Sequence, residues 1–345
     1  MSGAAGGTAP WVLGVDSGGS GIRAALAPAG ALGTAVSGSC REPVRTGPGG
    51  IDPGHLLELL APMAHGLRER SGGPALSAAV VGAAGMATLG GRLRAELPGA
   101  LEREFGVRRL ALAADAVTAY AGALGLRAGA VVAAGTGLIG LGTDLRTWRR
   151  ADGWGHLLGD CGGGAWIGRA GLEAALRAHD GRRGGSGPLL ERLEAVLGPP
   201  GGLPSLLYPR PDRPALLASF APEVARCASA GDTVAAGILR RAAEHLADTA
   251  EAVCPAPAGP GGSEVPLAFT GGLVRTGAPL LEPLHTELAR RLPHARMVPA
   301  AGDPLAGALL LAEALAVGGP LLPQAAGLLE VCADGSARNR TSSNG

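Results

Sequence analysis

The chain has 345 residues, of which 46% are hydrophobic and 17% charged, and a formal net charge of +1, as expected for a globular protein long enough for two domains. This balance gives no general attraction to nucleic acid or to an anionic membrane. The sequence contains no lysine, which excludes a Walker A loop, a protein-kinase site and Schiff-base chemistry.

The cysteines and the apolar segments indicate the cellular compartment in which the protein works. The cysteines are scattered, odd in number and without metal-site spacing, as expected for free thiols in a reducing cytoplasm: Cys40, Cys161, Cys227, Cys254 and Cys332. The N-terminal segment MSGAAGGTAP lacks the basic flank and apolar core of a signal peptide. The longest apolar stretch, 305–317, is too short to cross a bilayer. We therefore expect a cytoplasmic protein with no membrane partner.

The segment 12–26 reads VLGVDSGGSGIRAAL and predicts a β-hairpin, because two apolar runs flank a glycine-rich turn. Asp16 ends the first run, and the turn residues follow it: Ser17, Gly18, Gly19, Ser20 and Gly21. Glycine lets a backbone approach a bulky anion, so the turn N–H groups can face phosphate oxygens. A carboxylate at this position suits Mg²⁺ held through water. The alternative is an ordinary hairpin turn capped by its Asp.

Helices and strands then alternate. The pattern predicts a loop over 47–54, a helix over 55–70, a strand over 77–84, a helix over 92–105, a strand over 109–114 and a helix over 116–126. Asp115 stands where the strand 109–114 ends. Alternation of this kind, with polar residues at the strand ends, is typical of an α/β fold.

The second half begins by repeating the design of the first hairpin. A strand over 129–134, a turn at 135–137 and a strand over 138–142 again place glycine and a hydroxyl between two apolar runs, which predicts two related halves. Further elements are expected in chain order: a glycine-rich loop over 151–168, a helix ending near 180, helices over 189–197, 214–228 and 232–253, a linker over 255–263, a strand over 265–269, a helix over 280–292, a strand over 296–298 and a helix over 304–316.

Several motifs together resemble a known family. The chain is similar to the acetate and sugar kinase/actin superfamily and, within it, to the N-acetylglucosamine kinase and CoA-dehydratase-activator type of ATPase domain. The matching segments follow the family order: GVDSGGSGIR (14–23), AADAVTAYAGAL (113–124), AAGTGLIGLG (133–142), GWGHLLGDCGGGAWIGR (153–169), FTGGL (269–273) and GDPLAGALLLA (302–312). The resemblance implies an α/β, two-domain ribonuclease H-like (actin-like ATPase) fold, with mixed sheets flanked by helices and a cleft between the domains.

The expected domains are an N-terminal α/β domain over 1–117, a C-terminal α/β domain over 118–330 and a disordered polar tail over 331–345. The segment 181–262 has no motif and would form a helical insertion. The last helix is free to pack back on the N-terminal domain.

The resemblance also implies roles for the phosphate and nucleotide residues. Ser17, Gly18, Gly19 and Ser20 would bind the β- and γ-phosphates of ATP, and Asp16 would hold Mg²⁺ through water. Asp115 would take the proton from a sugar 6-hydroxyl, which agrees with the single aligned carboxylate that phosphoryl transfer needs; the alternative role is a helix N-cap. A second phosphate hairpin and an adenosine motif would come from glycines and a hydroxyl: Gly135, Thr136, Gly137, Gly271 and Gly272.

For the acceptor, the resemblance assigns Gly153, Trp154 and Asp160 to the sugar pocket. A Trp face can cover a pyranose ring and a carboxylate can accept from its hydroxyls, whereas the alternative for Trp154 is core packing. Cys161 replaces an acidic residue of the family. The segment 45–50 also lacks the Asn that is associated with an acetylated sugar, and Asp160 with Asp152 would suit an ammonium.

These features predict a cytoplasmic ATP- and Mg²⁺-dependent kinase for the 6-hydroxyl of an aminosugar, with glucosamine preferred and N-acetylglucosamine as the alternative. The expected partners are the sugar and ATP, with neither nucleic acid nor membrane, and the sequence leaves room for a homodimer. A second alternative is an activator ATPase of a CoA-dehydratase or reductase system. That alternative needs cluster-binding cysteines, and Val131 and Val132 occupy the place where such activators commonly carry one.

Overall fold

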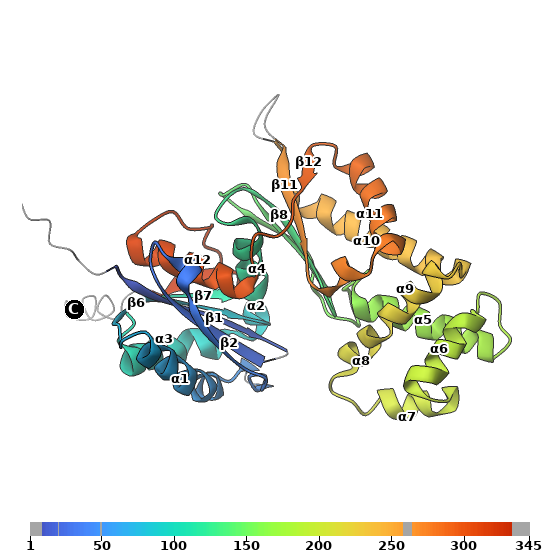
Figure 1. Ribbon diagram of the computed structural model, residues 1–345, viewed down its shortest axis with the longest axis horizontal. Coiled ribbons are helices and arrows are strands. Elements are labelled where there is room, and N and C mark those ends of the chain that lie inside the picture. The colour runs from blue at the N-terminus through green and yellow to red at the C-terminus, as the bar shows by residue number, and fades with distance from the viewer. Residues whose placement is uncertain (1–8, 20, 49, 258–263, 333–345) are drawn as a thin grey trace, which may run out of the picture. The chain divides into compact units, whose positions relative to one another are not determined.

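The computed structural model describes residues 9–19, 21–48, 50–257 and 264–332, and its chain divides into two compact units. Unit 1 consists of residues 1–127 and 300–345, and unit 2 of residues 128–299. The chain runs through unit 1, then through unit 2, and returns to unit 1 (Figure 1).

Unit 1 is built on a six-stranded mixed sheet with the order β13-β7-β6-β1-β2-β3. Its strands are β1 (Trp11–Gly18), β2 (Gly21–Pro28), β3 (Val36–Cys40), β6 (Leu76–Ala83), β7 (Arg109–Ala114) and β13 (Leu329–Cys332). Strands β1 and β2 pair as the predicted antiparallel hairpin, and β6 and β7 continue the sheet parallel to β1. A separate short ribbon pairs β4 (Thr46–Gly47) with β5 (Gly50–Ile51).

Helices cover both faces of this sheet (Figure 1). Helices α1 (Pro53–Arg70) and α3 (Gly91–Phe105) lie on one face, and α4 (Asp115–Leu124) and α12 (Pro304–Val317) on the other. The start of α1 is set by Asp52, whose side chain accepts hydrogen bonds from the backbone N–H groups of Gly54 and His55. A short helix α2 (Met86–Leu89) and a 3₁₀ turn (Leu32–Thr34) complete the unit.

Helix α12 is apolar on nearly all sides because it packs between α4 and the strands β1 and β6. Glycine makes this possible. An added Cβ at Gly14 of β1 would lie 2.8 Å from the backbone nitrogen of Leu309, and one at Gly307 would collide with the carbonyl oxygen of Thr118 in α4. The helix backbone therefore lies directly on the strand and on its neighbouring helix.

Unit 2 repeats the strand order of unit 1 around a five-stranded sheet, β10-β9-β8-β11-β12. Its strands are β8 (Gly129–Ala134), β9 (Leu138–Thr143), β10 (Trp148–Asp152), β11 (Val265–Thr270) and β12 (Ala295–Met297). In each unit an antiparallel three-stranded meander is followed by two parallel strands beside its first strand. The two related halves expected from the repeated hairpin design are therefore confirmed.

The helices of unit 2 are α5 (Gly164–His179), α6 (Gly187–Leu197), α7 (Leu203–Leu207), α8 (Arg213–Ser219), α9 (Ala221–Ser229), α10 (Thr233–Val253) and α11 (Ala278–Arg291), with 3₁₀ turns at Pro200–Gly202 and Gly272–Arg275. Helix α10 packs across β8, β9 and β10, and α5 contacts α6, α8 and α9. Phe220, fully buried where α8 meets α9, joins the core of this helical group. The segment 181–262 is thus helical as expected for most of its described part.

The structure differs from the expected domain limits. The division falls between residues 127 and 128 rather than between 117 and 118, because α4 is one continuous helix that packs on α12. Residues 331 and 332 belong to β13, which pairs with β7, instead of to a disordered tail. The rest of that expected tail, 333–345, lies outside the described residues.

Strands β3, β10 and β13 were not expected from the sequence. They are short and lie at the edges of their sheets, where a strand needs little apolar patterning. No helix within the described residues is long and apolar enough to cross a membrane.

The close packing of α12 predicts opposite effects for two helical Gly→Ala substitutions. Gly307→Ala forces α12 away from Thr118 and should lower the free energy of unfolding by about 1–3 kcal/mol. At Gly237 of α10 an added Cβ meets nothing within 4 Å, so Gly237→Ala should raise stability by about 0.5–1 kcal/mol. Urea unfolding of both variants checks this, and an unchanged midpoint for Gly307→Ala would contradict it.

Candidate active site

The first hairpin presents an open glycine turn at the end of β1. Gly18 and Gly21 pair across the two strands, and an added Cβ at Gly18 or Gly19 would meet nothing within 4 Å. The backbone at this turn is therefore accessible to a ligand. Ser17 is buried, with 4% of its surface exposed, and its carbonyl oxygen accepts a hydrogen bond from Ala84 N–H. Ser20, the other hydroxyl of the motif, lies outside the described residues.

Asp16 lies one residue before Ser17 and forms part of a charged triad. The Arg23 guanidinium donates to Asp16 Oδ2 through Nε at 3.1 Å and Nη2 at 2.6 Å. Its third nitrogen, Nη1, donates to Asp303 Oδ2 at 2.6 Å. Both hydrogen bonds on Asp16 fall on one oxygen, which leaves Oδ1 available to a further donor or a hydrated cation.

Asp303 also caps helix α12. Its Oδ1 accepts from Ala306 N–H at 2.9 Å. Burial opposes ionisation of Asp303, but the hydrogen bonds from Ala306 N–H and Arg23 outweigh it, so the pKa of this carboxyl is held below its ordinary value. Asp303 is therefore an anion at neutral pH.

Asp115 begins α4 directly after β7 and is solvent-exposed. Its Oδ1 accepts from the N–H of Ala116 at 2.9 Å, and its carbonyl oxygen accepts from the Thr118 hydroxyl. The bond from Ala116 orients the carboxylate at the start of α4, and the bond from Thr118 involves only the Asp115 backbone. Ala114 rather than Asp115 is the N-cap of α4, and no side chain caps the helix, so the alternative role of Asp115 as a helix N-cap is wrong.

The sheet brings Asp16 and Asp115 to the same edge of unit 1. Strands β1, β6 and β7 are parallel, with Asp16 opposite Gly82 and Gly82 opposite Ala113, two residues before Asp115. The two acids are thus separated by one intervening strand, or roughly 10 Å at two strand spacings. Ligands of open α/β sheets bind at this carboxyl edge of the strands.

The second hairpin, β8–β9, has a different setting. The carbonyl oxygens of Gly135 and Thr136 accept from Gly164 N–H and Ala165 N–H, so the turn satisfies the first donors of α5. Gly163 and Gly271 have no room for a side chain beside this turn: an added Cβ would lie 2.8 Å from the carbonyl carbon of Gly137 and 2.7 Å from that of Ala134, respectively. The Gly162–Gly164 run therefore serves close backbone packing.

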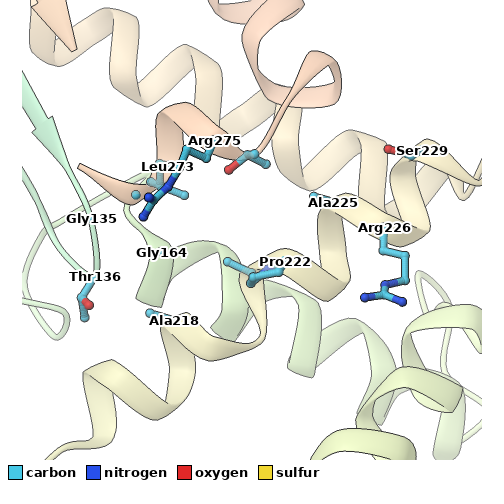
Figure 2. A pocket seen from close by; sticks show the side chains of 13 residues that line it. Gly135, Thr136, Gly164, Ala218, Pro222, Ala225, Arg226, Ser229, Leu273 and Arg275 are labelled. Carbon is cyan, nitrogen blue, oxygen red and sulfur yellow. The ribbon is translucent and has the colours of Figure 1, made fainter. Parts of the chain in front are cut away.

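A cavity of about 810 Å³ opens beside this hairpin within unit 2 (Figure 2). Gly135 and Thr136 line one end, and Leu273 and Arg275 line one wall. Gly272 also lines the cavity. Small side chains of α8 and α9 line the opposite wall: Ala218, Ala221, Pro222 and Ala225. Arg226 and Ser229 stand at the far end from Thr136. The cavity combines an apolar slot with cationic side chains, a setting that suits a nucleotide.

The loop after β10 carries the residues expected for the sugar. Trp154 is 67% exposed, and the Arg150 guanidinium carbon lies 5.0 Å from its ring centroid. Trp154 is therefore not a core residue, which excludes the packing alternative. Gly153 adopts a φ of +73° against Ile139, a conformation that favours glycine.

Asp152 and Asp160 hold this loop through backbone hydrogen bonds. Asp152 accepts from Asp160 N–H at 2.6 Å and Cys161 N–H at 2.9 Å, one on each carboxylate oxygen. Asp160 accepts from Gly155 N–H at 3.0 Å and hydrogen-bonds to the Leu138 backbone, and a side chain at Gly137 would collide with its carboxylate. Burial raises the pKa of Asp160, and the nearby Asp152 adds to this.

The structure thus brings the expected residues together in groups. Asp16, Gly18, Gly19 and Asp115 share one edge of unit 1, and Gly135, Thr136 and Gly272 share the cavity of unit 2. Gly137 and Gly271 do not line that cavity but support its hairpin. Sequence reasoning missed Arg23, Asp303, Arg275 and the wall from α8 and α9. The only signal for that wall was a run of Ala and Pro in a segment without motifs.

Residues 13–312 match the model of the BadF/BadG/BcrA/BcrD ATPase family. An N-acetyl-D-glucosamine kinase of Dictyostelium discoideum is 33% identical over 208 residues, which are 57% of this chain and 63% of that protein. An N-acetylmuramic acid/N-acetylglucosamine kinase of Clostridium acetobutylicum is 29% identical over 204 residues, 58% of this chain and 65% of that protein. The match therefore spans just under two thirds of the length of these curated relatives.

Solved structures extend the similarity over most of the chain. A protein of Chromobacterium violaceum, provisionally named an N-acetylglucosamine kinase, aligns with a TM-score of 0.65 and 28% identity over 88% of this chain and 98% of its own. A ROK family glucokinase of Streptomyces griseus, solved with glucose and AMPPNP, aligns with a TM-score of 0.53 and 20% identity over 88% of this chain and 98% of its own, a likeness in fold alone. The predicted actin-like fold is confirmed, and the chain belongs to the BadF/BadG/BcrA/BcrD ATPase family.

Proposed function

We propose that this protein is a sugar kinase that transfers the γ-phosphoryl group of ATP to the 6-hydroxyl of an aminosugar. The observation that carries the proposal is the exposed Asp115 carboxylate on the same sheet edge as the open glycine turn and Asp16. Phosphoryl transfer to a hydroxyl needs a carboxylate that aligns the hydroxyl and a backbone that can bind phosphate, and this sheet edge offers both. The names of the relatives, which are aminosugar kinases, support the acceptor class.

The base and ribose of the nucleotide are assigned to the cavity of unit 2. Apolar wall residues such as Pro222 and Ala225 suit a purine face, while Thr136 lies at the end where phosphates would enter. Because the chain has no lysine, cationic contacts to the nucleotide fall on arginine. Arg275 is the candidate, since Arg226 already pairs with Glu223 at 3.3 Å.

The residues present fit a magnesium ion that arrives with the nucleotide. Among the described residues, no group of three or more His, Cys, Asp or Glu side chains is arranged so that it could hold a metal ion. Mg²⁺ in phosphoryl-transfer sites needs only one or two carboxylates together with phosphate oxygens and water. Asp16 would hold it through water, and the ion would neutralise charge on the phosphates.

In the proposed reaction Asp115 accepts the proton of the sugar 6-hydroxyl. The hydroxyl oxygen forms a bond to the γ-phosphorus while the bond from that phosphorus to the β–γ bridging oxygen breaks, which releases ADP and the sugar 6-phosphate. The hydrogen bond from Ala116 N–H holds the Asp115 carboxylate at the start of α4, and an ionised carboxylate is the form that can act as a base.

For the acceptor we propose N-acetylglucosamine over glucosamine, which reverses the preference expected from the sequence. That preference required Asp160 and Asp152 to face an ammonium. Asp152 instead uses both oxygens on backbone N–H groups, and Asp160 also has backbone partners. A neutral acetamide does not need these carboxylates, and the exposed Trp154 and Leu157 offer apolar surface for a methyl group.

The activator ATPase remains a weaker alternative. Its cluster would need exposed thiols on a shared surface. Cys227 and Cys254 are buried, and burial raises the pKa of Cys254 to about 11. The partly exposed Cys40 and Cys332 lie on opposite edge strands of the unit 1 sheet, and Cys161 belongs to unit 2. Val131 and Val132 are buried in β8, so the expected cluster position holds apolar core residues.

The function is tested by ADP release with a panel of N-acetylglucosamine, glucosamine and glucose under one set of conditions. We expect kcat/KM to be highest for N-acetylglucosamine, and phosphorus NMR to place the product phosphate on carbon 6. ADP release that is independent of every sugar would support the activator ATPase instead.

The base is tested by Asp115→Asn. This substitution keeps the shape of the side chain but removes its basicity, so kcat should fall by roughly 10²–10⁴-fold while nucleotide affinity stays near that of the wild type. Asp52→Asn, another acid at a helix N-terminus of unit 1, serves as the matched control and should retain activity. A near-normal kcat for Asp115→Asn would exclude Asp115 as the base.

The role of Asp160 is tested by Asp160→Asn on both aminosugars. If the carboxylate holds the loop through Gly155 and Leu138, kcat/KM should fall by a similar factor, about tenfold or less, for both sugars. A loss confined to glucosamine would instead show that Asp160 reads an ammonium. Asp144→Asn is the control, because Asp144 also accepts from backbone N–H groups, those of Arg146 and Thr147, in a loop assigned no role.

A further inference from the structure

Arg23 joins two carboxylates that come from opposite ends of unit 1 in the sequence. Asp16 lies opposite Arg23 in the β1–β2 register, so both side chains leave the same face of the hairpin. Gly14, two residues earlier on β1, brings the backbone of α12 onto that face, which places Asp303 at the start of α12 beside them. The guanidinium is bidentate on Asp16 Oδ2 and donates to Asp303 Oδ2 with its remaining nitrogen.

Each nitrogen of the Arg23 guanidinium donates to one of the two carboxylates. Its side chain is 39% exposed, that of Asp16 15% and that of Asp303 52%, so the bond to Asp16 is the better shielded of the two. Nη1 and Nη2 of one guanidinium contact the two carboxylates, which therefore lie close together. Without a cation between them, two close carboxylates repel each other and attract a divalent ion.

We propose that Arg23 is a positioning residue that fixes the Asp16 carboxylate and, by neutralising the Asp16–Asp303 pair, keeps the hairpin from binding a divalent cation in the absence of nucleotide. The cation would then enter only with the phosphates, as the ATP-bound complex. This inference rests on the proposed role of Asp16, but it makes a prediction for the free protein that does not require any kinase activity.

The test measures Mn²⁺ binding to the free protein, without nucleotide, by electron paramagnetic resonance of unbound Mn²⁺. Wild-type protein should bind Mn²⁺ weakly. Arg23→Gln removes the charge at similar length and should tighten binding by about tenfold or more, because two unpaired carboxylates then face the ion. Arg23→Gln combined with Asp303→Asn should return to the wild-type level, and Asn can still cap α12 through its side-chain oxygen.

Two further variants separate charge from geometry. Arg23→Lys keeps the positive charge and should keep Mn²⁺ binding weak, but it lacks the guanidinium fork that holds one Asp16 oxygen. In the kinase assay it should lower kcat by about tenfold or more with little change in the KM for sugar. Arg94→Gln is the matched control: Arg94 pairs with Glu330 at 2.8 Å, is 30% exposed and lies outside the proposed site. It should change neither measurement.

Each result has a defined meaning. Tight nucleotide-free Mn²⁺ binding by the wild type, or unchanged binding by a folded Arg23→Gln variant, overturns the gating role. A wild-type kcat for Arg23→Lys overturns the positioning role. Because the wild-type measurement needs no variant, poor folding of Arg23→Gln does not remove the test. If no sugar is phosphorylated, the proposed function fails, while the Mn²⁺ series still decides this inference.

Discussion

The placement of the unit 1 site depends on backbone-to-backbone contact between α12, β1 and α4. Side chains normally hold such elements about 10 Å apart, but glycines at the contact points remove that layer. The missing side chain of Gly14 lets α12 lie directly on β1, and that of Gly307 lets α12 lie directly on α4. Gly122 of α4 lies against the carbonyl group of Asp303. A backbone hydrogen bond from Ala301 to Ala123 closes the same corner. As a result the start of α12 is fixed relative to the strand that carries Asp16 and the helix that begins with Asp115.

Glycines also allow close backbone contact in unit 2, where they position the β8–β9 turn. The carbonyl oxygens of this hairpin turn accept hydrogen bonds from the first N–H groups of α5. Gly163, Gly164 and Gly271 allow this turn to lie against backbone. The glycines that a motif search treats as one class therefore divide into two. Gly18, Gly19 and Gly272 leave open space for a ligand, whereas Gly163 and Gly271 are required by packing.

Charge in the proposed site is arranged without lysine. Arginine has a planar fork that can bind two carboxylates at once, and Arg23 does so with Asp16 and Asp303. Acids also act on backbone N–H groups: Asp303 caps α12, and Asp152 and Asp160 hold the loop that presents Trp154. The carboxylate oxygens of Asp152 and Asp160 accept hydrogen bonds from backbone N–H groups of their own loop. An acid in a sugar-associated motif can therefore hold the loop rather than contact the sugar.

The sequence by itself determined the hairpins, the alternation of strands and helices, the repeat of one design and the family. These follow from local patterns, namely apolar periodicity and glycine at turns, which depend on neighbours in the chain. It also placed Asp115 directly after a strand, and parallel strands then bring it to the same edge as Asp16. Asp16 itself was expected to end its strand, but β1 continues to Gly18 because Ser17 and Gly18 also pair with β2. What only the tertiary structure decided are contacts between distant residues: Asp303 with Arg23, the wall of α8 and α9 beside Thr136, and the pairing of β13 with β7. No local pattern encodes these contacts, because each depends on which surfaces meet when the elements pack.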